Sequence, residues 1–255
     1  MTIEFILLII VSYLLASVPA AYLVAKWSRG IDLRQYGTGQ VGVGNLWRMT
    51  RSLWLTIPAL IFDLGKGALM VWVGHLPMFG LSVGQQLTVG LAAIIGHNWP
   101  VFLRFSGGRG IGTMLGVVVI ITLINSNLAL WGLIAFLAII AIGIIIIRNS
   151  AVPVLVGITA LPFISWGFGQ PLSVTVGFLV LFLIIVIKRL TASQPIAVSI
   201  DKKQLLLNRL LYDRDIKDRK AWMYRRPQQQ EKQEKGAGEE VQDSSCRGSG
   251  GVPPP

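Results

Sequence analysis

Seven apolar segments, separated by short polar loops, constrain this chain more than any other feature of its sequence. They are residues 3–25, 53–74, 86–103, 111–124, 128–147, 151–165 and 171–187. A bilayer core about 30 Å thick is crossed by a helix of roughly 20 apolar residues, and by fewer where protein shelters the helix. The pattern predicts an all-α, polytopic integral membrane protein with seven transmembrane helices. Because only residues 125–127 divide the fourth segment from the fifth, six spans is an alternative.

The composition excludes the common soluble classes of protein. Hydrophobic residues make up 53% of the 255 residues and charged residues only 14%, whereas a typical soluble domain carries about 25% charged residues. The single cysteine, Cys246, has no partner in the chain, which excludes a disulfide scaffold and a cysteine-based metal site. We therefore expect the lipid bilayer to be the main solvent, and we expect no metal and no cofactor.

Basic residues alternate between the loops in a way that predicts an orientation. Lysine and arginine occur in the first, third and fifth loops and after the last segment, as Lys26, Arg29, Arg34, Arg48, Arg51, Arg104, Arg109, Arg148, Lys188 and Arg189. The second, fourth and sixth loops contain none. Since basic loops stay on the cytoplasmic side, seven spans place the N-terminus outside and the C-terminus in the cytoplasm. Merging 111–147 into one span would put Arg148 and the basic tail on the wrong side.

Two glycine-rich loops on the predicted cytoplasmic side carry the chemistry of a phosphate site. The first contains Gly37, Thr38, Gly39, Gln40, Gly42, Gly44, Asn45 and Arg48, and the second follows His97 with Gly107, Gly108, Arg109 and Gly110. Closely spaced glycines can turn several backbone N–H groups towards one point, and a helix N-terminus attracts anions. Arginine adds a planar fork suited to phosphate, and histidine exchanges protons near neutral pH. A flexible glycine linker and a histidine bonded to the backbone are the alternatives.

Two ionisable residues lie inside a predicted span, where a charged group is costly and by default indicates function. Asp63 and Lys66 are three residues apart, so they share one helix face and can neutralise each other. The pair either fixes helix packing or supports a site. Ser150, in the fifth loop, is a further candidate for a supporting role.

Around these loops the sequence resembles the bacterial membrane acyl-phosphate-dependent glycerol-3-phosphate acyltransferases. The matching motifs are residues 17–22, 30–34, 37–48, 63–67 and 96–113, in the order and spacing of the family. The resemblance covers about residues 8–190 and agrees with the seven-helix topology of the family. Within the motifs Thr38 replaces a serine, Gln40 an asparagine, Gly44 a threonine and Arg109 a lysine. The third motif of the family, expected near Lys188, is not matched.

The resemblance implies transfer of a fatty acyl group from acyl phosphate to the 1-hydroxyl of glycerol 3-phosphate, which yields lysophosphatidic acid for phospholipid synthesis. It implies catalytic roles for Thr38, Arg48 and His97. It implies a substrate phosphate site made of Gly37, Gly39, Gln40, Gly42, Asn45, Gly107, Gly108, Arg109 and Gly110. Asp63, Lys66 and Ser150 would support this site. The expected location is the plasma membrane, with the active face in the cytoplasm.

Two other functions stay open from the sequence. The unmatched third motif is compatible with a non-catalytic relative that binds a phosphorylated lipid or metabolite. The Asp63–Lys66 pair and the broken helices are compatible with an anion transporter, although the uncharged outer loops give it little support. The sequence assigns no oligomeric state.

The chain divides into three predicted parts: a membrane acyltransferase-like domain at 1–190, a basic juxtamembrane segment at 191–226, and a disordered tail at 227–255. The middle part carries leucines at a spacing compatible with an amphipathic helix. Residues 200–255 contain 12 basic and 9 acidic residues, a near balance that argues against a nucleic-acid partner. We expect the tail to be separate from the chemistry.

Overall fold

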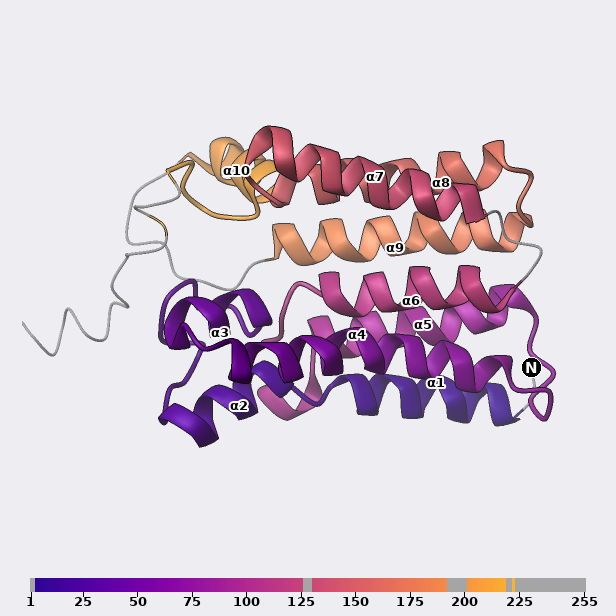
Figure 1. The fold of residues 1–255 in the computed structure, drawn as a ribbon, viewed down its shortest axis with the longest axis horizontal. Coiled ribbons are helices and arrows are strands. Elements are labelled where there is room, and N and C mark those ends of the chain that lie inside the picture. Colours follow the sequence, from indigo (N-terminus) through magenta and orange to yellow (C-terminus); the bar gives the residue numbers. More distant parts are fainter. Residues whose placement is uncertain (1–2, 126–129, 192–200, 219–221, 223–255) are drawn as a thin grey trace, which may run out of the picture.

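The computed structural model describes residues 3–125, 130–191, 201–218 and 222, and the regular structure in these ranges is helical. The long helices run side by side along one axis of the molecule (Figure 1). The helices are α1 (Ile3–Ala16), α2 (Ala20–Arg29), α3 (Val43–Thr50), α4 (Leu53–His75), α5 (Val83–Asn98), α6 (Ile111–Ile124), α7 (Leu130–Ile147), α8 (Ala151–Gly167), α9 (Leu172–Leu190) and α10 (Lys202–Tyr212), with a 3₁₀ turn at Val101–Leu103.

Each of the seven predicted apolar segments contains a helix, and proline explains where two of them differ from the prediction. The first segment is interrupted between α1 and α2, where Pro19 precedes the first residue of α2. Proline has no N–H to donate and clashes with a preceding helical turn. The third segment ends at Asn98 rather than 103, because the residue before Pro100 is driven out of the helical conformation.

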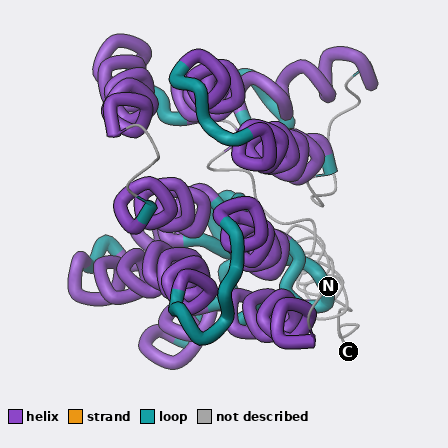
Figure 2. Tube along the Cα trace, turned by 90° about the vertical axis from the view of Figure 1, so that its right-hand side faces the viewer, coloured by secondary structure: helices purple, strands orange, loops and turns teal. Residues whose placement is uncertain are grey.

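Within the described residues, four helical stretches are long and apolar enough to cross a membrane, judged by length and composition. They are Ile3–Arg29, Leu53–His75, Leu130–Ile147 and Leu172–Leu190. The apolar helices α6 and α8 are shorter than these four. An end-on view separates the helices into two groups (Figure 2).

Packing within the two groups is close, and α9 connects them. In the first group α4 packs against α5 and α6, and in the second α8 packs against α7 and α9; α9 also contacts α5. Glycine permits the α4–α6 approach, since a Cβ at Gly116 would lie 2.0 Å from the carbonyl oxygen of Leu64. The main core, which includes Val117, Phe136 and Leu181, spans both groups.

The short helices α2, α3 and α10 gather at one end of the molecule, opposite the N-terminus (Figure 1). Helix α10 lies within the segment predicted as basic and partly helical. The predicted disordered tail at 227–255 lies outside the described residues. The gathering of short helices and loops at one end positions the candidate site.

Candidate active site

A cavity of about 660 Å³ is lined by the starts of three helices. Residues 42–44 bring the N-terminus of α3 to its wall, residues 110–112 that of α6, and residues 149–151 that of α8. Each helix N-terminus carries a partial positive charge and unpaired N–H groups. The cavity therefore has the electrostatic character of an anion site.

Charged side chains reinforce that character. Five arginines line the cavity, namely Arg48, Arg109, Arg148, Arg189 and Arg214, against the two carboxylates of Asp63 and Asp213. An apolar part of its wall comes from α4, α6, α7 and α8, through Leu60, Leu64, Leu115, Ile144 and Val154. One continuous cavity thus joins a cationic region to an apolar region.

The first glycine loop is folded around the buried side chain of Asn45. Its Oδ1 accepts the backbone N–H of Thr38 at 3.0 Å. Its Nδ2 lies within 3.0–3.1 Å of three backbone oxygens, those of Leu33, Tyr36 and Gln40. A Cβ at Gly37, where φ is +61°, would lie 2.4 Å from the Asn45 Oδ1. Both the backbone conformation and the close approach therefore require glycine there.

This loop presents some of its predicted site residues to the cavity and buries others. Arg48 lines the cavity, as do Gln40, Gly42 and Asn45. The side chain of Thr38 is buried at 1% exposure, and its Oγ1 accepts the N–H of Gln40 at 3.4 Å. Gly37, Thr38 and Gly39 are not among the lining residues, so they shape the loop from within.

The second glycine loop packs against the end of α5, and its residues Gly107 and Gly108 have no room for a side chain. A Cβ at Gly107 would lie 2.3 Å from the backbone oxygen of His97, and one at Gly108 would lie 2.3 Å from its Nε2. The N–H of Gly108 donates to that same oxygen at 3.2 Å. The loop thus holds the His97 ring beside Gly108, which lines the cavity with Arg109 and Gly110.

His97 contacts a buried ionic cluster formed by Asp63 and Lys66. Asp63 Oδ1 lies 2.9 Å from Lys66 Nζ and 3.4 Å from His97 Nδ1. Lys66 also donates to the backbone oxygen of Val18 at 3.4 Å, in the break between α1 and α2. The Asp63–Lys66 pair therefore ties the helix break to α4 and also contacts His97, which the sequence predicts as a site residue. Lys66 does not line the large cavity, whereas Ser150 does.

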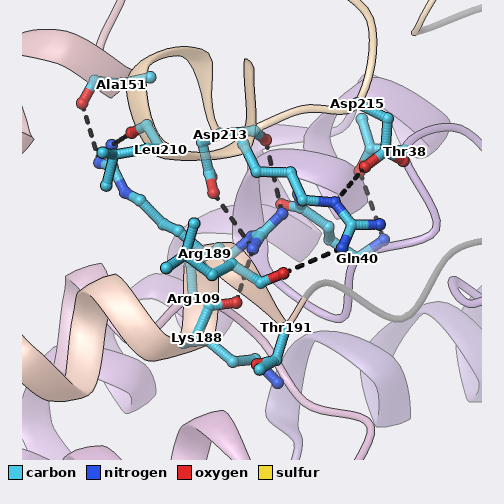
Figure 3. A network of polar contacts seen from close by, with 12 residues as sticks. Thr38, Gln40, Arg109, Ala151, Lys188, Arg189, Thr191, Leu210, Asp213 and Asp215 are labelled. Carbon is cyan, nitrogen blue, oxygen red and sulfur yellow. Dashed lines mark hydrogen bonds and ion pairs between the residues drawn. The ribbon is translucent and has the colours of Figure 1, made fainter. Parts of the chain in front are cut away.

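Arg109 stands at the centre of a polar network at the cavity (Figure 3). Its Nη1 donates to the backbone oxygen of Lys188 at 3.1 Å and lies 3.1 Å from Asp213 Oδ1. Its Nη2 donates to the backbone oxygen of Asp213 at 3.4 Å. The Gln40 amide, with its oxygen turned towards the guanidinium, accepts from Nη2 at 2.7 Å and from Nε at 3.0 Å. Arg109, which the sequence predicts as a phosphate ligand, thus contacts the first glycine loop, the last turn of α9 and the residue that follows α10.

Residues 202–218, which we call the C-terminal strap, are clamped onto the ends of α8 and α9. Arg189 donates from Nη1 to the backbone oxygen of Leu210 and from Nη2 to that of Ala151, both at 2.8 Å. Arg209 donates to the backbone oxygen of Leu190 at 2.9 Å and pairs with Asp215 Oδ1 at 2.7 Å. Residues 202–218 are therefore not separate from the candidate site, whereas the sequence analysis expects the tail to be separate from the chemistry.

Sequence reasoning missed several residues that line the cavity: Arg148, Arg189, Tyr212, Asp213, Arg214 and Trp222. Arg148 and Arg189 carried a signal, because both are among the basic residues that set the predicted orientation. The strap residues carried none, since Asp213 meets Arg109 across 104 positions of sequence. Among the described residues, no group of three or more His, Cys, Asp or Glu lies close enough to hold a metal ion.

The chain is similar over most of its length to known membrane enzymes. The profile of a family described as Glycerol-3-phosphate acyltransferase matches residues 6–196. Glycerol-3-phosphate acyltransferase 5 of Dehalococcoides mccartyi is 40% identical over 232 residues, which cover 88% of this chain and 95% of that relative. Glycerol-3-phosphate acyltransferase 4 of the same species, strain CBDB1, is 39% identical and covers 87% and 94%.

Two solved structures are also similar to this chain. The crystal structure of PlsY, an integral membrane glycerol 3-phosphate acyltransferase, in its glycerol 3-phosphate form superposes with a TM-score of 0.61 at 28% identity. The match covers 73% of this chain and 88% of PlsY. The lysophosphatidic acid form of PlsY gives a TM-score of 0.60 at 26% identity.

Proposed function

The chain belongs to the glycerol-3-phosphate acyltransferase family of integral membrane proteins, and from this premise we propose that it transfers a fatty acyl group from acyl phosphate to the 1-hydroxyl of glycerol 3-phosphate. The products are lysophosphatidic acid and inorganic phosphate. The observation that supports this reaction most strongly is the single cavity that joins three helix N-termini and five arginines to an apolar wall.

The two regions of the cavity match the two kinds of group in the substrates. Both substrates carry phosphate, which suits the helix N-termini and arginine forks. The acyl chain is apolar, and it fits between α4, α6, α7 and α8, where Leu64, Leu115 and Val154 line the cavity. The reacting carbonyl would then lie where the two regions meet.

The reaction needs positioning and charge stabilisation more than a covalent intermediate. The 1-hydroxyl oxygen attacks the acyl carbonyl carbon and forms the ester bond. The bond from that carbon to the phosphate oxygen breaks, and inorganic phosphate leaves with the electron pair. Because acyl phosphate is a mixed anhydride with a good leaving group, orientation and electrostatic stabilisation can supply much of the rate.

His97 is the proposed general base for the hydroxyl proton. Asp63, at 3.4 Å from Nδ1, would hold the ring with its Nδ1 proton inward and leave Nε2 to accept a proton beside Gly108. Arg48, Arg109 and the glycine-loop amides would hold the phosphates, and Ser150 would add a hydroxyl at the start of α8. Thr38 would act by shaping the loop that presents Gln40.

The proposed topology has seven spans, an outer N-terminus and a cytoplasmic active face in the plasma membrane. It is supported by the gathering of α2, α3 and α10, with the basic loops, at one end of the bundle (Figure 1). The single cysteine offers a direct test. On intact cells, a membrane-impermeant thiol reagent should spare Cys246 and should label a Cys246→Ser, His75→Cys variant; the reverse labelling would refute the orientation.

The reaction is tested with purified protein, acyl phosphate and labelled glycerol 3-phosphate. We expect lysophosphatidic acid to form, and no turnover under conditions where PlsY works would refute the proposal. Binding of glycerol 3-phosphate without turnover would identify a non-catalytic relative, and uptake into proteoliposomes would identify a transporter. The choice of an acyl thioester as an alternative donor is measured in the same assay.

Two pairs of variants sharpen this test. His97→Gln should lower kcat by about 10²- to 10⁴-fold, as expected for loss of a general base, whereas His75→Gln, the same change at the end of α4, should leave kcat unchanged. Arg48→Ala should weaken phosphate binding more than Lys66→Ala, because only Arg48 lines the large cavity. Equal losses from both, with the fold intact, would place Lys66 in the site.

A further inference from the structure

Arg109 has one N–H that faces an anion without forming a good hydrogen bond to it. A guanidinium has five N–H donors. Four hydrogen bonds go from Arg109 to the Gln40 amide oxygen and to the backbone oxygens of Lys188 and Asp213. The remaining Nη1 donor faces Asp213 Oδ1 at 3.1 Å, yet that buried oxygen receives no hydrogen bond within the described part of the chain.

Asp213 is the contact of Arg109 that can give way most easily. The backbone oxygen of Lys188 belongs to the last turn of α9, and Gln40 belongs to the loop that Asn45 organises. Asp213 instead follows α10 directly and has a φ of +57°, in the left-handed region that residues with a Cβ disfavour. Burial raises the pKa of its carboxyl despite the neighbouring Arg109 and Arg189.

A phosphate group is the stronger partner for the same position. It carries between one and a half and two negative charges near neutral pH and has three terminal acceptor oxygens. Asp213 offers one charge and one nearby oxygen, and both it and Arg109 line the cavity. The clamp through Arg189 and Arg209 would hold α10 in place while the carboxylate turns away.

We propose that the Asp213 carboxylate occupies a phosphate subsite at Arg109 in the free protein, and that a phosphorylated substrate displaces it. The inference rests on the proposed function only for the identity of that substrate. Asp213 thereby lowers the apparent affinity for phosphate, because a ligand binds only the fraction of molecules in which Arg109 is available. The strap thus sets the substrate concentration that the site requires.

The test is Asp213→Asn in the full chain, which removes the charge and keeps a residue that tolerates the left-handed region. We expect the Kd for inorganic phosphate and the KM for glycerol 3-phosphate to fall by about threefold to tenfold. The matched control is Asp201→Asn, which removes the same charge from the exposed N-cap of α10. It should change both constants by less than about twofold, since Asp201 does not line the cavity.

A double-mutant cycle with Arg109→Lys tests whether the change in phosphate affinity comes from the Arg109–Asp213 pair. With lysine at 109 the Asp213→Asn change should lose most of its effect, because the competition is for the guanidinium. Unchanged or weaker phosphate binding in Asp213→Asn would overturn the inference, and weaker binding would mean that Asp213 positions Arg109. Absence of phosphate binding in both chains would overturn it too.

These readouts separate the inference from the proposed function. If phosphate binding tightens as expected but no acyl transfer occurs, the competition at Arg109 stands and the transferase reaction fails. If transfer occurs but Asp213→Asn does not change the phosphate affinity, the transferase reaction stands and the competition at Arg109 fails. Thermal unfolding of Asp213→Asn, with hydrogen exchange over α10, should show the strap still docked; a released strap would itself contradict displacement by rotation of the carboxylate alone.

Discussion

The glycine loop at 37–45 and the C-terminal strap at 202–218 both contribute residues to the same cavity, but different interactions hold them. The loop is bonded through a neutral amide, Asn45, to backbone groups 5–12 positions away. The strap is held by Arg109, Arg189 and Arg209, through contacts that span from 6 to 104 positions. The loop is therefore a local structure, and the strap depends on the fold that is already formed around it.

The largest effect should follow Asn45→Ala, which removes the centre of the loop. Four backbone groups would lose the Asn45 side chain as their partner, two of them in fully buried bonds and two in partly buried ones, so we expect the free energy of unfolding to fall by about 3–5 kcal/mol. Transferase activity should fall with it, because Gln40 and Gly42 lose their positions. Denaturant unfolding in detergent micelles measures the first effect and the turnover assay the second.

Asn149→Ala is the matched control for that prediction. Asn149 makes one local bond, in which its Oδ1 accepts the N–H of Ala151 at 3.2 Å. Its loss should cost about 1 kcal/mol, as is typical of a single hydrogen bond. Similar losses from the two asparagines would show that the glycine loop is not organised by Asn45.

A smaller and more local effect should follow Arg209→Gln in the strap. The change removes the pair with Asp215 and the bond to the backbone of Leu190. We expect the opening free energy of α10 to fall by about 1–3 kcal/mol while the glycine loop is unaffected. Hydrogen exchange measured by mass spectrometry resolves the two segments.

The comparison with Lys203→Gln isolates the contacts of Arg209 from its charge, since Lys203 is an exposed basic residue of the same helix. It should leave exchange over α10 nearly unchanged. If Arg209→Gln accelerates exchange equally in the glycine loop, then loop and strap open as one unit and the contrast between them fails.

The smallest expected effect on stability is that of removing the Asp32–Arg34 ion pair, which precedes the first glycine loop. Asp32 accepts from Arg34 Nη2 at 2.7 Å and from Nε at 3.0 Å, and these bonds lower the pKa of the Asp32 carboxyl. Its stabilisation is therefore present above the ordinary aspartate pKa near 4 and is lost as the pH falls through the lower folded value. Because Arg34 is 40% exposed, the pair is worth about 0.5 kcal/mol.

Asp32→Asn should accordingly destabilise the protein slightly at pH 7 and by less at pH 2. Thermal unfolding at the two pH values, in the same detergent, measures the change. A larger loss at pH 2 than at pH 7 would contradict the sign, and a loss of several kcal/mol at pH 7 would mean that the loop is also held by charge.

The predictable part of the fold is the part that local sequence encodes. Apolar segments of the right length gave the positions of seven helices, and Pro19 and Pro100 mark where two of those segments break. The sequence predicts the glycine loops as phosphate-binding elements, because closely spaced glycines and a nearby arginine form such a site within a few positions of the chain. Gln40 lines the same cavity as His97 and Arg109, although it lies more than 50 positions before either of them.

The part of the candidate site that the sequence does not predict depends on contacts between side chains that are far apart in the chain. Nothing in the sequence near Thr38 indicates that its hydroxyl faces the loop interior, because burial is decided by the packing of α2, α3 and α4. Asp213 is one of many charges in a nearly balanced tail, and its meeting with Arg109 follows from the docking of α10 on α8 and α9. The role of a charge in that tail could not be inferred from its composition.

The tight packing of the second glycine loop also bears on inhibitor design. Gly107 and Gly108 have no space for a Cβ, because the backbone and the ring of His97 lie 2.3 Å from where it would sit. A compound that recognised the main chain of this loop would contact positions where almost any substitution disturbs the proposed catalytic histidine. Resistance by point mutation would then have to arise outside these two positions.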